Sequence, residues 1–391
     1  MAKITEGYTG YMDEQEIQSI LTELLYCVIN GIESDTALNG KLTSEVLTSV
    51  YRLAKKHSLA HLVARYVYSS KIEAEPTLKA KLHQNDLAAV CGYERMKYVY
   101  GQVCEIFEKN EIAYIPLKGA VLRAYYPTED MRTSCDIDIL IKEEALDTAV
   151  SVLKEAGFQG GERHYHDVSL YAPDGTHLEL HFSLQENIDT LDAVLQDAWN
   201  YAAPIEGYRY GFDKAFFVFY TYAHMSYHFL SGGCGMRSLL DVWVMEQKMD
   251  APYACAETLL QQAGIYRFAM EMSKLANRCF TQRNGVDPVL KYIWRGGVYG
   301  SSKNKMAVKK EREGTFSYVL RKTFPPYKTM AMSYPNLRKC AILLPFCWMH
   351  RGVKAIFKGK TARLAAEIAD SNRLAEEELL EVKEVVSRLG L

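Results

Sequence analysis

The chain has 391 residues, of which 48% are hydrophobic and 24% charged, and its formal net charge is −2. This composition is typical of a globular protein of two or three domains, and the near-neutral total charge favours no class of partner. The first residues contain no apolar run behind a basic start, and no window holds about 18 uninterrupted apolar residues. We therefore expect neither a secretory signal nor a membrane-spanning helix.

Nine cysteines are spread along the chain, and none forms a CxxC pair. An odd number of cysteines, several of them within apolar periodic stretches, indicates buried thiols rather than a disulfide framework. The sequence therefore predicts a reduced, cytoplasmic protein without structural zinc.

Residues 13–109 show apolar positions at helical spacing, as in EIQSILTELLYCVIN, and they contain no strand signal. We expect residues 1–110 to form an N-terminal helical region.

The pattern changes at residue 112. Ile112–Leu117 and Asp136–Ile141 are predicted strands, and Lys142–Ala156 is a predicted amphipathic helix. Val168–Ala172 and Thr176–Phe182 are two further strands around a Pro-Asp-Gly turn. With a short helix before residue 127, the order is β-α-β-α-β-β, which predicts a small α/β core over residues 111–188.

Helical spacing returns after residue 189, in Lys214–Leu230 and Met236–Met249, which a glycine-rich turn separates. We expect residues 189–294 to form a helical region that completes a cleft over the α/β core. Arg295–Thr315 is rich in Gly, Ser and Lys and indicates a loop or a domain boundary. Residues 295–391 would then form a basic C-terminal helical region.

Two carboxylates mark the second predicted strand. Asp136 and Asp138 are two residues apart, so their side chains point to the same face. Two adjacent carboxylates repel each other unless a cation lies between them, and oxygen ligands favour Mg²⁺ or Mn²⁺. Glu179 would complete a three-carboxylate cluster if its strand pairs beside this one. The alternative is a solvated strand face, but the neighbours Ile137 and Ile139 indicate a buried strand.

Lys118 and Gly119 follow the first predicted strand, at its turn into a helix. Glycine lets the backbone approach a phosphate, and a helix N-terminus favours an anion. The alternative is an ordinary tight turn.

The succession of a strand, a small-residue turn, a helix, an Asp-x-Asp strand and a lone acid on a further strand resembles the polymerase-β-like nucleotidyltransferase superfamily. The sequence is most similar to its branch of uncharacterised bacterial nucleotidyltransferases. The residues that carry the resemblance are Leu117-Lys118-Gly119, Arg132, Asp136-Ile137-Asp138-Ile139 and Glu179-Leu180-His181. The resemblance covers residues 112–182 and, more loosely, the helical region to about residue 245. It implies an α/β (α+β) fold in which a small mixed-sheet core is embedded between N-terminal and C-terminal helical regions.

The resemblance also implies an activity and a role for each matching residue. An NTP such as ATP would bind with two Mg²⁺ ions, and a nucleotidyl group would be transferred to an acceptor. Asp136 and Asp138 would hold the metal on the triphosphate, and they would share the second metal with Glu179, which is also the best-placed base. The superfamily usually has Gly-Ser or Gly-Gly at the turn, so its serine contact to the triphosphate is missing here. Lys118 would supply a charge instead, and Arg132 would either contact phosphate or lie at the surface.

The helical region holds a second group of candidates. His224 and His228 share one helix face, and Arg237 and Asp241 share a face of the next helix. His228 and Arg237 are candidate nucleotide contacts. The alternatives are histidines packed among tyrosines and an Arg237–Asp241 ion pair. Two further histidines share the strand face of Glu179 and are equally open: His177 and His181.

Residues 302–360 contain 14 Lys or Arg and two Glu, a net charge of +12, which leaves −14 for the remainder. Such a segment could attract RNA, a phosphorylated acceptor or anionic lipid, or it could simply solvate a helical region. Within it, the apolar run Cys340–Met349 is too short to span a membrane. It is either a buried helix broken at Pro345, which we favour, or a helix lying on a surface.

Three functions remain open from the sequence. The first is an active nucleotidyltransferase whose acceptor is a small hydroxylated molecule, a sugar, a protein side chain or an RNA end. The second is a catalytically inactive nucleotide-binding module, which the missing Gly-Ser turn favours. The third is a metal phosphohydrolase, which is less favoured because the sequence does not place mixed histidine and aspartate ligands near one another.

Overall fold

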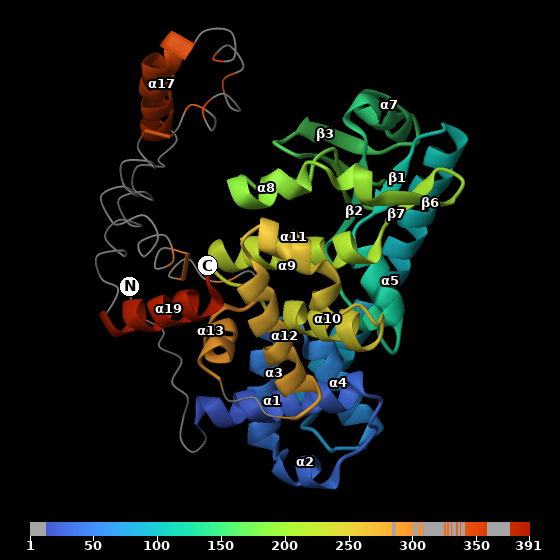
Figure 1. Ribbon diagram of the computed structural model, residues 1–391. Helices are drawn as coiled ribbons and strands as arrows, with labels where there is room; N and C mark the ends of the chain where they lie inside the picture. The colour runs from blue at the N-terminus through green and yellow to red at the C-terminus, as the bar shows by residue number, and fades with distance from the viewer. Residues whose placement is uncertain are drawn as a thin grey trace.

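The computed structural model describes residues 13–283, 287–298, 300, 304–305, 308, 324–325, 327, 330, 334, 337, 341–357 and 376–391. In the sequence order of these residues, a seven-stranded mixed sheet lies between helical regions (Figure 1). The predicted α/β organisation, with helices before and after a small sheet, is confirmed.

The N-terminal region is helical, as predicted. It consists of α1 (Glu14–Ile29), α2 (Thr36–Lys41), α3 (Ser44–Lys56), α4 (Ala60–Ser69) and α5 (Pro76–Lys109). Helix α5 begins with Pro76 in its first turn, where the missing N–H has no helical partner to lose. Its first half buries Leu78 and Leu82 in the helical core, and its second half buries Val103 and Phe107 against the sheet. Helix α5 therefore connects the two parts of the molecule.

The sheet has the strand order β3-β4-β5-β2-β1-β7-β6. The pairs β2·β5 and β1·β7 are parallel, and the other four pairs are antiparallel. The strands are β1 (Tyr114–Pro116), β2 (Asp136–Ile141), β3 (Gln159–Arg163), β4 (Asp167–Tyr171), β5 (His177–His181), β6 (Ala202–Glu206) and β7 (Arg209–Phe212). Short helices link them: α6 (Lys118–Leu122), α7 (Leu146–Glu155), α8 (Asp189–Leu195) and 3-10 turns at Arg123–Tyr125, Glu129–Met131, Glu143–Ala145 and Ala198–Tyr201.

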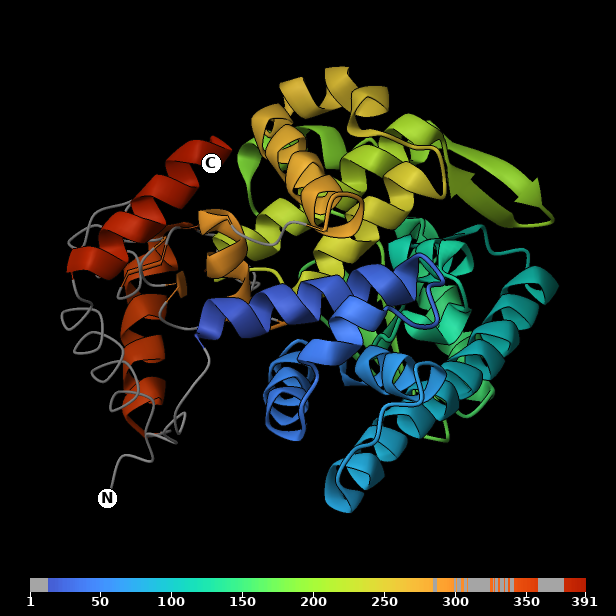
Figure 2. The ribbon, with the colours of Figure 1, turned by 90° about the horizontal axis from the view of Figure 1, so that it is seen from below.

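Three of these strands were not predicted. Strand β3 has the sequence QGGER, so it lacks the alternation of apolar residues that marks a strand, and it lies at the sheet edge. Strands β6 and β7 form a hairpin in a region that we expected to be helical throughout; it extends to the upper right in Figure 2. All three strands are mostly or partly exposed, and pairing with a neighbour rather than burial of an apolar face forms them.

The two faces of the sheet have opposite character because side chains alternate along each strand. Ile137, Ile139, Leu178 and Leu180 pack with α5 and α7 in one apolar core. The other face carries the polar residues of β2 and β5 and is directed toward the helices that follow the sheet. The fold therefore places the predicted carboxylates between the sheet and the helical region.

Several helices follow the sheet, and most of them contribute buried residues to the larger core. They are α9 (Lys214–Leu230), α10 (Met236–Gln247), α11 (Glu257–Gln262), α12 (Tyr266–Phe280), α13 (Pro288–Gly296), α17 (Leu344–Phe357), α19 (Glu376–Leu389) and 3-10 turns at Tyr253–Ala256 and Ala341–Leu343. Asp213 caps the N-terminus of α9, and its carboxylate accepts a hydrogen bond from the Phe216 backbone N–H at 2.8 Å. Helix α13 continues to residue 296 and so includes the first two residues of the predicted loop, and most of the rest of that loop lies outside the described residues.

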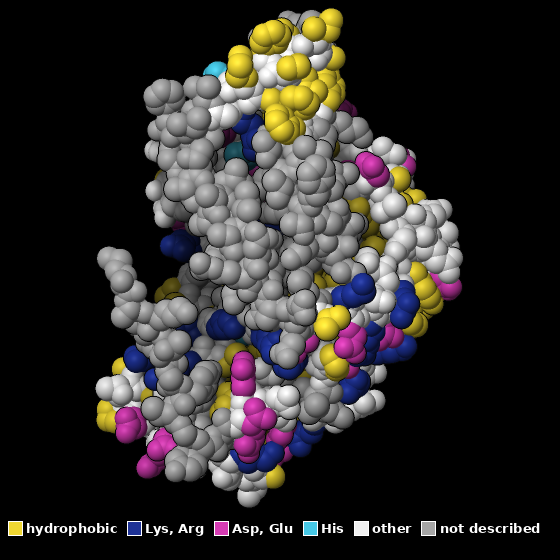
Figure 3. Space-filling view, turned by 90° about the vertical axis from the view of Figure 1, so that its left-hand side faces the viewer, with side chains coloured by type: hydrophobic (Ala, Val, Ile, Leu, Met, Phe, Trp, Pro, Cys, Tyr) yellow, Lys and Arg dark blue, Asp and Glu magenta, His cyan; other side chains and the backbone are white. Residues whose placement is uncertain are grey.

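The apolar run at residues 340–349 is not the buried helix that we favoured. Helix α17 starts at Leu344 and includes Pro345 in its first turn, where proline is tolerated, so the helix is not broken there. Ile342, Phe346 and Met349 are 81%, 61% and 64% exposed. Figure 3 shows hydrophobic side chains gathered at its top, over this helix. The described part of the run is therefore exposed along one side, and its binding to a further surface stays a prediction.

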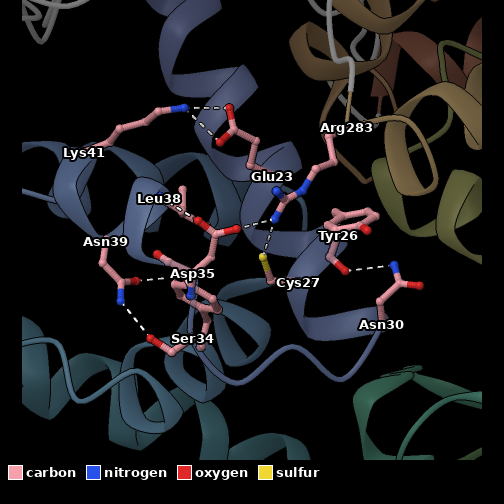
Figure 4. A network of polar contacts seen from close by, with 11 residues as sticks. Glu23, Tyr26, Cys27, Asn30, Ser34, Asp35, Leu38, Asn39, Lys41 and Arg283 are labelled. Atoms are coloured by element: carbon pink, nitrogen blue, oxygen red, sulfur yellow. Dashed lines mark hydrogen bonds and ion pairs between the residues drawn. The ribbon is translucent and has the colours of Figure 1, made fainter.

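A network of polar contacts joins α1 and the start of α2 to the segment that follows α12 (Figure 4). Arg283, after α12, donates hydrogen bonds to Asp35 Oδ2 at 2.7 Å and to the buried Cys27 Sγ at 3.3 Å. Its guanidinium also lies over the Tyr26 ring, 4.5 Å from the centroid. Because Asp35 also caps α2 through the Leu38 N–H, one arginine joins the start of the chain to the end of α12.

A buried histidine makes a similar long-range connection. His57 is fully buried, and its Nε2 lies 3.0 Å from the Trp294 carbonyl oxygen. The Met236 backbone N–H donates to Nδ1 at 3.4 Å, so the ring must be neutral with its proton on Nε2. Burial lowers the pKa of His57 to about 4.

We expect acid to destabilise the fold through His57. The unfolded state binds a proton near the ordinary histidine pKa of about 6.5 and the folded state only near 4, so stability is lost as pH falls between these values. The loss amounts to about 3 kcal/mol for this residue. Urea unfolding at both ends of that pH range should show a smaller loss for His57→Gln than for the wild type. An exposed control on α5, His83→Gln, should keep the wild-type slope, and an equal slope in all three proteins would contradict the assignment.

Candidate active site

Strands β2 and β5 bring the predicted carboxylates together. They pair in parallel, with Asp138 opposite Glu179 and Asp136 opposite His177. The prediction that the Glu179 strand pairs beside the Asp-x-Asp strand is therefore confirmed. Since i and i+2 residues share a face, His181 points to the same side. The carboxylates and histidines of two adjacent strands thus form one polar cluster.

Two groups of side chains in this cluster have the spacing of metal ligands. In each group, one donor atom per residue lies within 4.8 Å of the others, and Glu179 belongs to both. The groups are Asp136–His177–Glu179 and Asp138–Glu179–His181. A shared carboxylate between two triads is the arrangement expected for one or two divalent cations.

The charges of the cluster are unbalanced. Burial raises the pKa of Glu179 to about 7, and the Asp138 carboxylate adds to the rise. The pKa of Asp136 is raised by burial and then by repulsion from Asp138. Burial also disfavours ionised Asp138, but His181, Lys118 and Arg132 together outweigh burial and lower its pKa. The carboxylates of the cluster therefore carry more negative charge than the single histidine His181 can neutralise.

His181 is the counter-charge within the cluster. Its Nε2 lies 3.5 Å from Asp138 Oδ1 and 3.7 Å from Glu179 Oε2. Burial favours the neutral ring, but these carboxylates raise its pKa. The His166 ring stacks on the His181 ring with centroids 5.6 Å apart. The stack fixes the plane in which His181 meets the two carboxylates.

The Lys118–Gly119 turn lies beside the cluster, where β1 passes into α6. The Leu117 N–H donates to the Asp138 carbonyl oxygen at 3.1 Å, which holds the turn against β2. Burial, together with the charges of Arg132 and Arg237, lowers the pKa of Lys118 to about 8. In the part of the chain that the structure describes, the Lys118 amine makes no ion pair. It is a desolvated cation at the edge of the carboxylate cluster.

Arg132 lies behind this turn, neither at the surface nor in an open loop. Its guanidinium donates to Asp241 Oδ1 at 2.8 Å and Oδ2 at 2.9 Å, and both side chains are only 4% exposed. Tyr126 donates to the same carboxylate at 2.8 Å. A Cβ on Gly119 would meet Arg132 Nη1 at 3.1 Å, so the small residue lets the arginine support the turn.

The alternative prediction of an ion pair between Arg237 and Asp241 is therefore wrong. Asp241 binds Arg132, and Arg237 donates to the Thr133 carbonyl oxygen at 2.8 Å. The buried guanidinium reaches both carboxylate oxygens in a planar fork, a geometry stronger than an exposed i, i+4 pair. Helix α10 is consequently joined to the loop before β2.

The histidines of α9 face the cluster from the other side. His228 Nε2 lies 2.9 Å from His224 Nε2, and His224 Nδ1 lies 3.3 Å from Glu186 Oε1. The packing alternative is partly correct, because His224 also lies near the Tyr220 ring and His228 near the Tyr227 ring. Their polar contacts are nevertheless with each other and with Glu186.

Except for His177, the candidate residues from the sequence line one cavity of about 320 Å³ between the sheet, α9 and α10. They are Lys118, Gly119, Arg132, Asp136, Asp138, Glu179, His228 and Arg237. A larger cavity of about 910 Å³ adjoins it and shares Ser183 and Leu184. This second cavity has aromatic walls, and the cluster carboxylates line only the smaller one.

Sequence reasoning missed Glu186 and His166, which line the same cavity. Both lie in segments between elements, where no periodicity assigns a face. In the sequence, a carboxylate five residues after His181 is only a weak indication of a functional residue. Its place in the site follows from the tertiary structure, which brings Glu186 next to His224 of α9.

Most of the basic segment 302–360 lies outside the described residues, including Lys303, Lys309, Lys310 and Arg312. Its suggested anionic partner stays a prediction. Among the described helices, none has the length and apolar character needed to cross a membrane.

Comparison with known proteins agrees with this geometry. A family model described as an uncharacterised nucleotidyltransferase matches residues 45–281, more than half of the chain. The matched range includes the cavity from Lys118 to Arg237. No curated protein and no solved structure shows significant similarity. On the strength of this match, the chain belongs to the family of uncharacterised nucleotidyltransferases.

Proposed function

We propose that this protein transfers a nucleoside monophosphate from an NTP to a hydroxyl group of an acceptor, with Mg²⁺ or Mn²⁺ as cofactor. The observation that carries the proposal is the parallel pairing of β2 and β5, which sets Asp136, Asp138 and Glu179 on one cavity wall. We further propose that the site has the architecture of the polymerase-β-like nucleotidyltransferases. The free cysteines of the described residues support a reducing, cytoplasmic environment.

The donor set fits a divalent cation. Three carboxylates meet in a partly buried cluster, and the pKa values of two of them, Asp136 and Glu179, are raised by burial and mutual repulsion. A cation between the carboxylates would remove this repulsion. When bound, it would neutralise the triphosphate and stabilise the charge that develops in the transfer. Carboxylates favour Mg²⁺ and Mn²⁺, and the histidines His177 and His181 tilt the choice toward Mn²⁺.

The part of the cavity beside the carboxylate cluster suits the phosphates. Lys118 is a desolvated cation that makes no ion pair within the described residues, and Arg237 lies in the same wall. Gly119 gives the phosphate chain access to the backbone of the turn. Arg132 supports this turn from behind, while a direct contact between Arg132 and phosphate stays a prediction. His228 is the proposed nucleotide contact from α9.

These groups bind and orient, which is the main requirement of phosphoryl transfer. Lys118 and Arg237 hold the triphosphate against the turn, so that its α-phosphorus faces the carboxylates. The acceptor hydroxyl approaches from the adjoining cavity of about 910 Å³, whose shared wall is Ser183 and Leu184. Glu179 would be the best-placed group to accept the hydroxyl proton.

One observation favours a second candidate, a metal phosphohydrolase. The sequence placed His177 and His181 on the strand face of Glu179 but not beside the two aspartates, and each of the two ligand groups contains one of these histidines. Mixed histidine and carboxylate ligands occur in hydrolytic two-metal sites. The observation against this second candidate is that Lys118 and Arg237 are two cations beside the cluster, where they could bind a triphosphate. The inactive nucleotide-binding module remains the outcome in which binding occurs without chemistry.

One assay separates these functions. The protein is incubated with each α-labelled NTP, Mg²⁺ or Mn²⁺, and hydroxylated acceptors that include sugars, RNA and protein. Label transferred to an acceptor, with release of pyrophosphate, supports the proposal. Release of inorganic phosphate without transfer would favour the phosphohydrolase, and binding without turnover would favour the inactive module.

We expect Lys118→Ala to raise the KM for the NTP by about tenfold to a hundredfold and to leave kcat nearly unchanged. A contact to a charged group contributes about 1.5–3 kcal/mol, and this one acts equally on bound substrate and transition state. Steady-state kinetics of label transfer would measure both constants. The matched control is Lys274→Ala on the exposed face of α12, which should behave as wild type. A large fall in kcat at constant KM would refute the binding role.

A further inference from the structure

The cavity contains a second set of titratable side chains, to which the metal cluster gives no role. Glu186, His224 and His228 form a hydrogen-bonded chain along the α9 wall. His224 stands in the middle, 3.3 Å from Glu186 through Nδ1 and 2.9 Å from His228 through Nε2. The sequence proposes His228 as a nucleotide contact and places His224 on the same helix face, and it gives Glu186 no role.

The distances restrict where the protons can be. Two ring nitrogens 2.9 Å apart require one proton between them, and a neutral histidine carries one proton in all. If Glu186 is protonated, it donates to His224 Nδ1, His224 donates from Nε2, and His228 carries its proton on Nδ1. If Glu186 is ionised, every proton shifts by one place, and His228 Nδ1 is bare. The two states differ by one proton that leaves or enters at His228 Nδ1.

The burial of the chain favours neutral rings and a protonated acid. Burial raises the pKa of Glu186 to about 7 and lowers that of His228 to about 4, and the pKa of His224 is lowered well below its usual value for the same reason. Near neutral pH both rings are therefore uncharged, and Glu186 exchanges its proton. The charged and titratable groups that surround the chain are Lys118, His166, His181, Asp192 and Arg237.

The two ends of the chain face different parts of the cavity. Among the charged groups outside the Glu186–His224–His228 chain, His181 of the carboxylate cluster has the largest effect on the pKa of Glu186. The charged groups that act on His228 are Lys118 and Arg237, the two cations assigned to the triphosphate. Within the described part of the chain, His228 Nδ1 has no hydrogen-bond partner. The open end of the chain therefore lies where the leaving pyrophosphate would be held.

We propose that Glu186, His224 and His228 form a proton-supplying chain that protonates the leaving pyrophosphate, an inference that rests on the proposed function. The acceptor oxygen bonds to the α-phosphorus, and the bond from that phosphorus to the α–β bridging oxygen breaks. The His228 Nδ1 proton passes to the pyrophosphate, the His224 Nε2 proton to His228 Nε2, and the Glu186 proton to His224 Nδ1. The proton of the acceptor hydroxyl goes to Glu179 or to water, and Glu186 is reprotonated from solvent.

This arrangement solves a chemical difficulty. A neutral imidazole N–H is a very weak acid, so His228 alone could not protonate a leaving group. When the protons move along the chain, the group that finally loses a proton is the carboxylic acid of Glu186. A carboxylic acid in this environment can release its proton near neutral pH. His228 is the catalytic residue of the chain, and Glu186 and His224 are positioning residues that act through it.

The test uses the full chain with an α-labelled NTP, Mn²⁺ and glycerol as hydroxyl donor, and follows label into glycerol, into NMP and into the protein itself. We expect Glu186→Gln to lower kcat by about a hundredfold, the lower range for loss of a general acid, with KM for the NTP nearly unchanged. The wild-type rate should fall as pH rises above about 7, where Glu186 loses its proton, and the variant should lack this limb. His228→Asn should behave in the same way.

A second substrate distinguishes proton supply from a structural role. A β,γ-difluoromethylene NTP has a less basic leaving group, so the deficit of Glu186→Gln should shrink strongly with it. The matched control is Glu246→Gln, a partly buried carboxylate that accepts hydrogen bonds from Tyr222 and Ser273 outside the cavity. This control should transfer label as the wild type does with both substrates.

The outcomes separate the two proposals. If the wild type transfers no label from any NTP, both the proposed function and the proton-supplying chain are overturned. If the wild type transfers label but Glu186→Gln matches it, the chain alone is overturned. The same holds if the variant is impaired equally with both leaving groups or keeps the wild-type pH profile.

Discussion

Asp138→Asn is expected to abolish nucleotidyl transfer, with a loss of at least about a thousandfold in kcat/KM, and Asp136→Asn should do the same. Each change removes a charged ligand from the group that would hold the cation, and stabilisation of developing charge commonly contributes most to the acceleration of such reactions. The measurement is label transfer with Mg²⁺ and with Mn²⁺. Mn²⁺ binding by calorimetry provides a readout that does not depend on activity, and both variants should bind it more weakly.

The two aspartates should differ in their effect on stability. The pKa of Asp136 is raised by burial and by Asp138, so its loss relieves repulsion, and the melting temperature should hold or rise. Asp138 has His181 as a partner, and its loss leaves that ring without its closest carboxylate. Asp250→Asn, at a side chain that is 98% exposed, is the control for a lost surface charge. Full activity of both cluster variants with Mg²⁺ would refute the metal assignment.

Asp241→Asn should destabilise the fold by about 3–5 kcal/mol, because it leaves the Arg132 guanidinium buried without a counter-charge. Both side chains are 4% exposed, so water cannot replace the lost carboxylate oxygen. Burial alone would raise the pKa of Asp241, and the charge of Arg132 lowers it, which shows how strongly the pair is coupled. Urea unfolding monitored by circular dichroism would measure the loss.

A double variant tests the origin of this effect. Arg132→Met combined with Asp241→Leu removes both charges, and much of the lost stability should return, since apolar replacements of buried pairs are often neutral. The same protein should still bind the NTP poorly, because the support of Gly119 is gone. The exposed pair of Lys41 and Glu23 is the control, and Lys41→Ala should cost at most about 1 kcal/mol. A similarly small loss for Asp241→Asn would show that the pair does not hold the turn.

The local sequence pattern was sufficient to predict the elements in which buried residues recur at a regular spacing. The alternation of acidic and apolar residues in β2 predicted both the strand and the shared face of Asp136 and Asp138, because side chains alternate along any strand. The N-terminal helices followed from apolar positions at helical spacing. Strands β3, β6 and β7 could not be predicted in this way, since none of their residues is buried and no alternation of buried and exposed positions marks them.

The sequence by itself determined that Asp136 and Asp138 lie side by side on a buried strand, and it identified Glu179 as a third acid. Only the tertiary structure decided that β5 pairs in parallel beside β2, that Asp241 binds Arg132 rather than Arg237, and that Glu186 meets His224. The physical reason is that a strand or helix fixes the direction of its own side chains through local geometry. Contacts between residues 38 or 109 positions apart depend on how whole elements pack, and a local pattern carries no record of that packing.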